Sequence, residues 1–271
     1  MIHLTDIERG TDAVSTLFKR TRAQNRPAFW PYYPIGYPDY TTSLQIIIAM
    51  AEAGVDGFEI GMPFSDPLAD GPIIQAAAQR ALENGVTVRT CLRAVSELRA
   101  KGVRQPVMMM GYLNPLLAYG PEAFVRDAKA AGADGIVVPD LPPEEGNEFI
   151  EFCQRESMAL PFFLAPTSTA ERVALVAERA SGFIYVVSLT GVTGVRSTLS
   201  DDLASFVARL REHTHELPLV LGFGISQPAH VNAIKQLVDG FIVGSALVRA
   251  GAEGVEPVRS LVEALCLAAR T

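Results

Sequence analysis

The same short pattern occurs four times along this 271-residue chain and predicts a repeating α/β architecture. In each copy a helical stretch ends at small residues, an Asp-Gly or Ser-Gly pair follows, and a short apolar run comes next. The four copies are AGVDGFEIG (53–61), AGADGIVVP (131–139), ASGFIYVV (180–187) and LVDGFIVG (237–244). Small residues and glycine stop a helix and allow a sharp turn, so the pattern predicts helix-to-strand joints that lead into buried strands.

Four further apolar runs alternate with these joints and bring the expected strands to eight. The expected strands span residues 28–34, 56–62, 106–110, 134–139, 161–165, 182–188, 218–222 and 240–243. The segments between them have the apolar spacing of amphipathic helices, and an extra helix is expected from Thr11 to about Arg22. Near-continuous apolar strands that alternate with helices predict a single closed parallel (β/α)8 barrel over residues 1–271, with this N-terminal extra helix.

A doubly wound open sheet is the competing fold. It usually has fewer strands, and its phosphate-binding glycines follow the first strand. Here the turn after residues 28–34 contains only Gly36, and no Pro-, Gly- or Ser-rich linker divides the chain. The barrel is therefore the preferred prediction.

Charge and cysteine content argue against several classes of partner. Acidic residues outnumber basic ones 30 to 23, and the resulting net charge of −7 disfavours both nucleic acid and anionic membranes. The apolar runs fall far short of the ~20 residues that a membrane span needs. Three cysteines in expected helices and a start without signal-peptide features suit the cytoplasm. His213 and His215 have no third ligand nearby, so no metal site is expected.

Glu59 is the strongest catalytic candidate. In the expected strand 56–62, Phe58, Ile60 and Met62 share one face, which suits contact with the helices. Glu59 then points into the barrel between two glycines that leave space. No expected strand contains Lys, Arg or His, so a raised pKa and proton delivery near neutral pH are predicted, with a structural role for the buried carboxylate as the alternative.

Asp70 is a second candidate, in SDPLADGP (65–72). Asp-Gly-Pro is typical of a turn that leads into a helix, with Pro72 in the first helical turn. The segment lies in the longest interval between expected strands, and long connections often carry function. A structural and a functional role for Asp70 are about equally supported, with the interval's length slightly favouring function.

Three glycine-rich turns follow the last three expected strands. They are TGVTG (190–194), GFGIS (222–226) and GSALV (244–248). Glycines let backbone N–H groups approach an anion closely, and a helix that begins at Ser245 would direct its positive end toward it. Barrels of this kind often bind phosphate after strands seven and eight, so a phosphate site is predicted.

What the chain lacks narrows the reaction type. Its four lysines lie in expected helices away from the strand ends, which argues against Schiff-base chemistry. No metal-ligand spacing and no Ser-His pair is found. Carboxylate acid–base chemistry on a small phosphorylated substrate remains.

The stretch GFEIGMPFSDPLADGP (57–72) resembles the signature of the tryptophan synthase alpha chain family. The similarity continues in order through NP (114–115), PDLPPEE (139–145), SLTGVTGVR (188–196), GFGIS and VGSA (243–246). The resemblance implies a (β/α)8 barrel that cleaves indole-3-glycerol phosphate to indole and glyceraldehyde 3-phosphate. It also implies an alpha2beta2 complex in which a pyridoxal-phosphate beta chain receives the indole through a tunnel and joins it to serine. No cofactor is then expected in this chain.

The resemblance also suggests roles for individual residues. Glu59 matches the acid–base carboxylate that protonates indole C3, Asp70 matches the carboxylate that holds the indole N–H, and Tyr185 matches a position near Glu59. The other matching positions are Gly194, Gly224, Gly244 and Ser245 in the phosphate turns, Phe223 and Tyr112 at the indole pocket, and Thr193 in the loop that closes over Asp70.

Several positions depart from the family pattern or concern the partner. Pro34 and Tyr37 stand where many relatives have Thr and Asp, and Leu189 stands where some have Arg; these departures concern loop closure and coupling to the beta chain. LNPLLAYG (113–120) is either a partner contact or ordinary helix packing. TGVTGVRSTLS (190–200) is a candidate mobile lid.

Three other functions remain open. A stand-alone lyase that releases free indole would use the same residues. A non-catalytic activating subunit is disfavoured because Glu59, Asp70 and all three glycine turns are present. A barrel isomerase for phosphorylated sugars is disfavoured because Phe223 and the apolar strand ends suit an indole ring.

Overall fold

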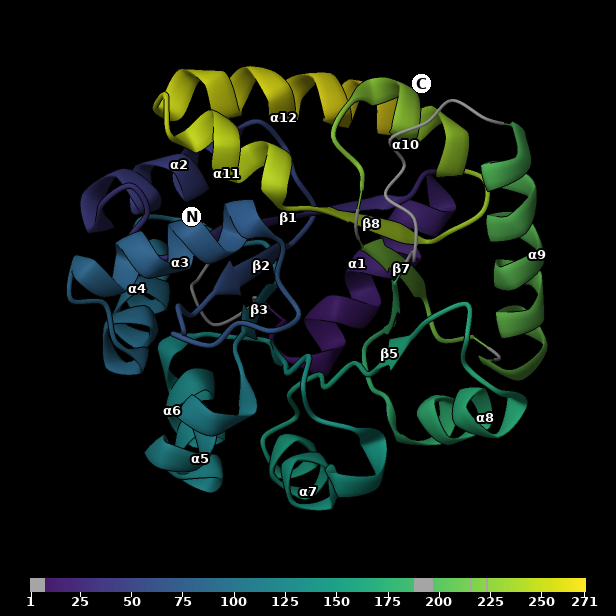
Figure 1. Cartoon of the computed structure of the whole chain (residues 1–271), viewed down its shortest axis with the longest axis horizontal. Helices are drawn as coiled ribbons and strands as arrows, with labels where there is room; N and C mark the ends of the chain where they lie inside the picture. The colour runs from purple at the N-terminus through teal and green to yellow at the C-terminus, as the bar shows by residue number, and fades with distance from the viewer. Residues whose placement is uncertain (1–7, 188–196, 215, 223) are drawn as a thin grey trace.

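A computed structural model of the chain describes residues 8–187, 197–214, 216–222 and 224–271. It shows eight parallel strands surrounded by helices (Figure 1). All eight expected strands are present, the first and last with the expected bounds and the others somewhat shorter. They are β1 Ala28–Pro34, β2 Phe58–Gly61, β3 Val107–Met110, β4 Gly135–Val137, β5 Phe163–Leu164, β6 Ile184–Val187, β7 Leu219–Gly222 and β8 Gly240–Val243.

The strands form a ring in the order β4-β3-β2-β1-β8-β7-β6-β5. Among the described residues, β4 and β5 share no ladder, and a single bridge between Gly135 and Ala159 joins them. The Ile136 N–H donates to the Ala159 carbonyl at 2.8 Å, and the Ala159 N–H donates to the Asp134 carbonyl at 2.9 Å. The ring therefore closes at the start of β4, and the expected (β/α)8 barrel is confirmed.

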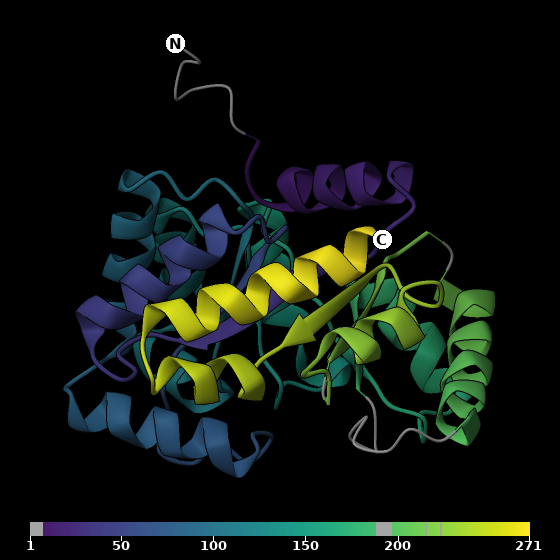
Figure 2. The same cartoon turned by 90° about the horizontal axis from the view of Figure 1, so that it is seen from above.

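Helices cover the outside of this ring, as Figures 1 and 2 show. Two helices lie between β2 and β3, which explains the long interval there. The helices are α1 Thr11–Ala23, α2 Tyr40–Glu52, α3 Pro72–Glu83, α4 Val88–Ala100, α5 Leu113–Tyr119, α6 Pro121–Ala131, α7 Asn147–Arg155, α8 Ala170–Arg179, α9 Ser197–Thr214, α10 Pro228–Ile234, α11 Ser245–Gly251 and α12 Val255–Arg270, with a 3-10 turn at Pro143–Glu145. The described part of the chain contains no helix that is long and apolar enough to cross a membrane.

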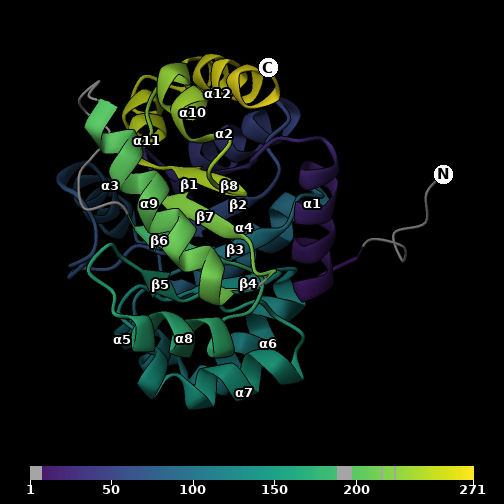
Figure 3. The same ribbon diagram turned by 90° about the vertical axis from the view of Figure 1, so that its right-hand side faces the viewer.

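The extra helix α1 is present as expected and covers the N-terminal end of the barrel (Figure 3). Its Phe18 ring stacks on Trp30 of β1 with centroids 6.0 Å apart. The same ring lies 6.1 Å from Phe183, which immediately precedes β6. Because both partners belong to the barrel interior, α1 closes one end and leaves the opposite end for a site.

The four sequence joints form one repeated contact, which we call the strand-start clamp. In each clamp, the residue before the glycine donates its backbone N–H to a carbonyl near the start of the preceding strand. In return, the side chain of this joint residue accepts the backbone N–H of the strand residue whose carbonyl it contacts. Two hydrogen bonds therefore tie an odd-numbered strand to the next even-numbered one. The side-chain bonds are Phe29 N–H to Asp56 at 3.0 Å, Val107 N–H to Asp134 at 2.9 Å, Leu160 N–H to Ser181 at 2.9 Å and Leu219 N–H to Asp239 at 2.8 Å.

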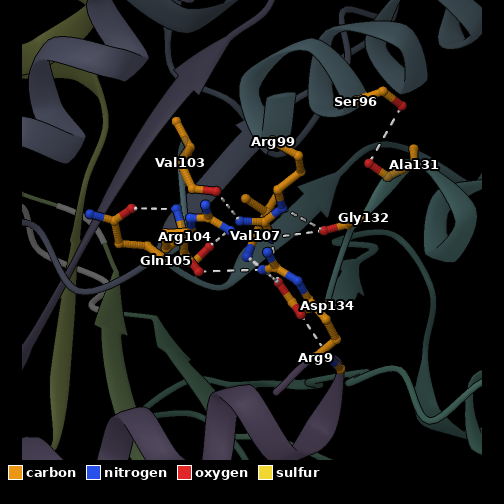
Figure 4. Close-up of polar contacts among 11 residues, drawn as sticks. Arg9, Ser96, Arg99, Val103, Arg104, Gln105, Val107, Ala131, Gly132 and Asp134 are labelled. Carbon is orange, nitrogen blue, oxygen red and sulfur yellow. Dashed lines mark hydrogen bonds and ion pairs between the residues drawn. The ribbon is translucent and has the colours of Figure 1, made fainter. Parts of the chain in front are cut away.

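Two arginines pair with each of the three clamp aspartates, and Figure 4 shows those at Asp134. The Asp134 side chain is fully buried and lies 2.6 Å from an Arg99 guanidinium nitrogen. It also accepts the Gly10 N–H at 2.7 Å. Arg99 in turn donates to the carbonyl oxygens of Gly132, Val103 and Gln105. The N-terminal rim of the barrel is thus held by a buried, fully hydrogen-bonded ion pair.

Candidate active site

Glu59 points into the barrel, as strand parity predicts. It lies in register with Tyr32 of β1, and its side chain is buried at 4% exposure. The glycines on either side of it make room for side chains of the neighbouring strand β1. A Cβ on Gly57 would collide with the Trp30 ring, and a Cβ on Gly61 would collide with the Tyr32 ring. The space that these glycines leave is therefore filled by two aromatic rings of β1, which pack around Glu59.

Tyr185 reaches Glu59 from β6. Its hydroxyl donates to Glu59 Oε2 at 3.4 Å, which is a long hydrogen bond. The Tyr185 ring stacks on Phe163 of β5 with centroids 4.4 Å apart, and a Cβ on Gly222 would collide with the same ring. Strand parity alone leaves the direction of Tyr185 open, and the structure places it inward, next to Glu59.

Glu59 has no cationic partner among the described residues, which agrees with the absence of basic residues from the strands. Burial raises the pKa of its carboxyl to about 8. The nearby carboxylate of Asp70 adds to this rise, and the hydrogen bond from Tyr185 opposes it. At neutral pH the carboxyl is therefore mostly protonated and can act as an acid.

Asp70 lies in the loop between β2 and α3, where it forms the expected turn that leads into a helix. Its backbone forms a turn, with its N–H donating to the Pro67 carbonyl at 3.0 Å, and α3 begins at Pro72. Its side chain does not cap the helix. Instead it accepts the Tyr112 hydroxyl at 3.0 Å, and it lies near enough to Glu59 for its charge to affect that carboxyl.

The surroundings of Asp70 raise the pKa of its carboxyl less than those of Glu59 raise the pKa of the Glu59 carboxyl. Burial raises the pKa of the Asp70 carboxyl to about 6, and the hydrogen bond from Tyr112 limits the rise. Tyr112 follows β3 and is 2% exposed; its hydroxyl also accepts the Ala69 N–H at 3.1 Å, and its ring packs on Phe64. Tyr112 therefore anchors the Asp70 loop, a contact between residues 42 positions apart that no local pattern shows.

Tyr32 has no role in the sequence reasoning above, yet it lies at the centre of this arrangement. It is 6% exposed, and its closeness to Asp70 and Glu59 adds to the effect of burial in raising the pKa of its phenol well above the usual value. Alternation along residues 28–34 places Trp30 and Tyr32 on one face. That signal could have found Tyr32 once Glu59 was placed inside the barrel.

The phosphate turns are described only in part. The helix α11 begins at Ser245 as expected, directly after Gly244. A Cβ on Gly244 would lie 3.3 Å from atoms of both Ile74 and Tyr32, so the backbone packs closely there. Gly224 has a φ of +82°, a conformation that favours glycine. Gly194, Thr193, Phe223, Leu189 and most of the candidate lid at 190–200 lie outside the described residues.

A cavity of about 360 Å³ opens at the carboxyl ends of β4, β5 and β6. Its lining includes Pro139 after β4, Phe163 of β5 and Val187 of β6. Phe163 also stacks on Tyr185, but neither Tyr185 nor Glu59 lines this cavity. In an eight-stranded parallel barrel, active sites lie at this end of the strands.

Two exposed leucines lie near the loops that carry the site. Leu68, in the loop of Asp70, is 92% exposed, and Leu117 of α5 is 50% exposed, whereas its neighbour Leu116 is buried. The segment 113–120 therefore combines helix packing with an exposed apolar residue, so both of its sequence interpretations stay open. Pro34 ends β1, close in sequence to Tyr37.

Comparisons with known proteins point in one direction. A family profile described as tryptophan synthase alpha chain matches residues 18–270. The tryptophan synthase alpha chain of Chloroflexus aurantiacus is 48% identical over 87% of this chain and 88% of that protein. That of Roseiflexus castenholzii is 50% identical over 87% of this chain and 90% of that protein.

Solved structures agree with these relatives. A chain of tryptophan synthase from Mycobacterium tuberculosis matches with a TM-score of 0.89 and 39% identity, covering 97% of this chain and 100% of that one. The tryptophan synthase alpha chain from Legionella pneumophila matches with a TM-score of 0.86 and 29% identity, covering 94% of this chain and 96% of that one.

Proposed function

Because the chain belongs to the tryptophan synthase alpha chain family, we propose that the carboxyls of Glu59 and Asp70 carry the reaction of that family. The chain cleaves indole-3-glycerol phosphate to indole and glyceraldehyde 3-phosphate. The observation that supports the residue assignment is the pair Glu59 and Asp70, whose pKa values of about 8 and about 6 lie on either side of neutrality. Such a pair supplies one acid and one anion at the same pH.

Glu59 is proposed as the proton shuttle. In its protonated form it gives its proton to indole C3, which leaves a positive charge on the ring. The bond between C3 and the first carbon of the side chain then breaks, and its electron pair restores the aromatic indole. The hydroxyl on that carbon becomes the aldehyde of glyceraldehyde 3-phosphate, and its proton returns to the Glu59 carboxylate. Protons and electrons balance over the cycle, and Tyr185 holds the carboxyl in place at 3.4 Å.

Asp70 is proposed to stabilise the charge that this proton transfer creates. The positive charge of the protonated ring is shared with the indole N–H, so a carboxylate that accepts this N–H favours the intermediate. With a pKa of about 6, Asp70 is ionised at neutral pH. Tyr112 donates to one of its oxygens and fixes the loop, leaving the other oxygen for the substrate.

The phosphate end of the substrate is assigned to the glycine turns. We propose that backbone N–H groups around Gly244 and Ser245 bind the phosphate together with the turns that contain Gly194 and Gly224, and that Phe223 and Thr193 contact the indole and close the loop. The start of α11 at Ser245, directly after Gly244, supports this assignment because the first N–H groups of a helix are free to bind an anion.

Family membership also implies a beta-chain partner. We propose an alpha2beta2 tetramer in the cytoplasm, with residues 1–271 as one barrel domain and no cofactor in this chain. The beta chain would hold pyridoxal phosphate and receive the indole. Exposed Leu117 and Leu68 suit such a partner contact.

The rate of indole release from indole-3-glycerol phosphate tests this function, measured with the purified chain alone and after addition of its beta chain. We expect slow release alone and faster release in the complex. Release near ~10 s⁻¹ from the isolated chain would instead identify a stand-alone lyase. No release in either condition would support the non-catalytic subunit or the sugar isomerase.

The pH dependence of kcat/KM is expected to be bell-shaped. Activity should rise through about pH 6 as Asp70 ionises and fall through about pH 8 as Glu59 loses its proton. The rate should be measured from pH 5 to 9 at constant ionic strength. In Asp70→Asn the remaining activity should lose the acidic limb and keep the alkaline one. A flat profile of the native enzyme over this range would contradict the assignment.

A further inference from the structure

Tyr32 spans the distance between the two ends of the proposed site. Its backbone lies in register with Glu59 on the neighbouring strand, so both side chains face the barrel interior. The tip of its ring lies against Gly61, and the base of its ring lies against Gly244. The phenol thus extends from the turn assigned to phosphate toward the carboxyls of Glu59 and Asp70.

The hydroxyl of Tyr32 differs from those of the other two tyrosines at the site. Tyr112 donates to Asp70, and Tyr185 donates to Glu59. Within the described residues, the Tyr32 hydroxyl has no hydrogen-bond partner, although the side chain is 6% exposed and lies close to both carboxyls. Unlike the Tyr33 hydroxyl, the Tyr32 hydroxyl is not one of the fully enclosed polar atoms that lack a partner. A polar group that has no protein partner and is not sealed off is available to a ligand.

The substrate must place its polar chain along this phenol. Its ring end belongs at Glu59 and Asp70 and its phosphate at Gly244 and Ser245, and the three carbons between them carry two hydroxyl groups. We propose that the Tyr32 hydroxyl forms a hydrogen bond with a hydroxyl of this three-carbon chain and so makes the site selective for the hydroxylated substrate. This inference rests on the proposed function, because it takes both ends of the substrate from it.

The variant Tyr32→Phe tests the inference with two ligands. One is indole-3-glycerol phosphate. The other is 3-(indol-3-yl)propyl phosphate, which keeps the ring, the three carbons and the phosphate but has no hydroxyl. Loss of one hydrogen bond to a substrate hydroxyl is expected to lower kcat/KM for the substrate about tenfold. The dissociation constant of the propyl phosphate should change by less than about twofold.

Tyr33→Phe is the matched control. Tyr33 is the next residue of the same strand. Its hydroxyl also has no partner in the described part of the chain, but it is fully buried on the outer face against Gly251. Removing its hydroxyl should leave both measurements unchanged. Melting temperatures of both variants confirm that the chain is folded.

Each outcome separates the inference from the proposed function. A loss confined to the hydroxylated substrate supports the inference. An equal loss for both ligands would show that Tyr32 acts only by packing. Unchanged kinetics with the substrate would show that its hydroxyl contacts no substrate atom. Either result overturns the inference while the function stands. If the native chain with its beta chain released no indole, the proposed function itself would fail.

Discussion

Replacing Glu59 with glutamine is expected to lower kcat for indole release by about 10³-fold. Glutamine keeps the shape of the side chain and can still accept the hydrogen bond from Tyr185, but it has no proton to give to indole C3. Indole formation should be followed spectroscopically with the beta chain present, so that activation by the partner does not limit the comparison.

Ligand binding serves as the control for this variant. The analogue 3-(indol-3-yl)propyl phosphate binds at the indole and phosphate ends of the site but cannot react. Glu59→Gln should therefore bind it within about twofold of the native affinity. Native turnover in the variant would show that Glu59 is not the proton donor. Loss of binding together with turnover would indicate a disrupted site instead.

The same substitution should stabilise the fold at alkaline pH. The pKa of Glu59 is about 8 in the folded chain and near its usual value of 4.5 when unfolded. Between these values the folded state holds a proton that the unfolded state has released, so the stability of the native chain falls as pH rises through this window and levels off above it. Glutamine does not titrate, and its advantage in urea unfolding should therefore be larger at pH 9 than at pH 5.

Removing the carboxylate of Asp134 is expected to lower the free energy of unfolding sharply. Asp134→Ala leaves Arg99 buried at 11% exposure without its counter-ion and leaves the Gly10 and Val107 N–H groups without their acceptor. Breaking one partner of a buried ion pair costs about 3–5 kcal/mol in the free energy of unfolding. Urea titration followed by circular dichroism measures this loss.

Glu122→Ala is a matched control because it removes a carboxylate from an exposed pair. Glu122 and Arg155 are 62% and 57% exposed, and such pairs contribute at most about 1 kcal/mol. Turnover per folded molecule should stay near native in both variants, because the clamp at Asp134 lies at the opposite end of the barrel from Glu59. A loss below about 1 kcal/mol for Asp134→Ala would contradict the clamp's importance.

The barrel was predictable because its signals are local and repeated. The joints before β2, β4, β6 and β8 each combine a helix stop with an apolar run, and β1 and β8 have the bounds expected from their composition alone. The shorter strands differ for a non-local reason. β5 keeps only two residues, Phe163–Leu164, because its ladder with β6 covers only these two, and β4 meets this part of the chain only at Ala159.

The site was predictable only where strand parity or a motif reaches. The inward direction of Glu59 follows from alternation within one strand. The pairing of Glu59 with Tyr32 depends on the register between β1 and β2, which the packing of the whole barrel sets. The contact of Asp70 with Tyr112 depends on two loops that meet only in the folded chain. Such relations between elements cannot be predicted from the sequence of either segment alone.

The strand-start clamps divide the barrel into four building blocks. Each clamp joins an odd strand to the even strand that follows it, so β1 with β2, β3 with β4, β5 with β6 and β7 with β8 are each secured by their own two hydrogen bonds. No clamp of this kind joins one block to the next within the described ranges. The connections between blocks, such as 62–106 after β2, are therefore the natural places to open the chain or to exchange a block, because a cut there leaves every clamp whole. The block formed by β1 and β2 carries both Tyr32, the residue of the proposed specificity contact, and Glu59, the proposed proton shuttle, so the two could be transferred as one piece.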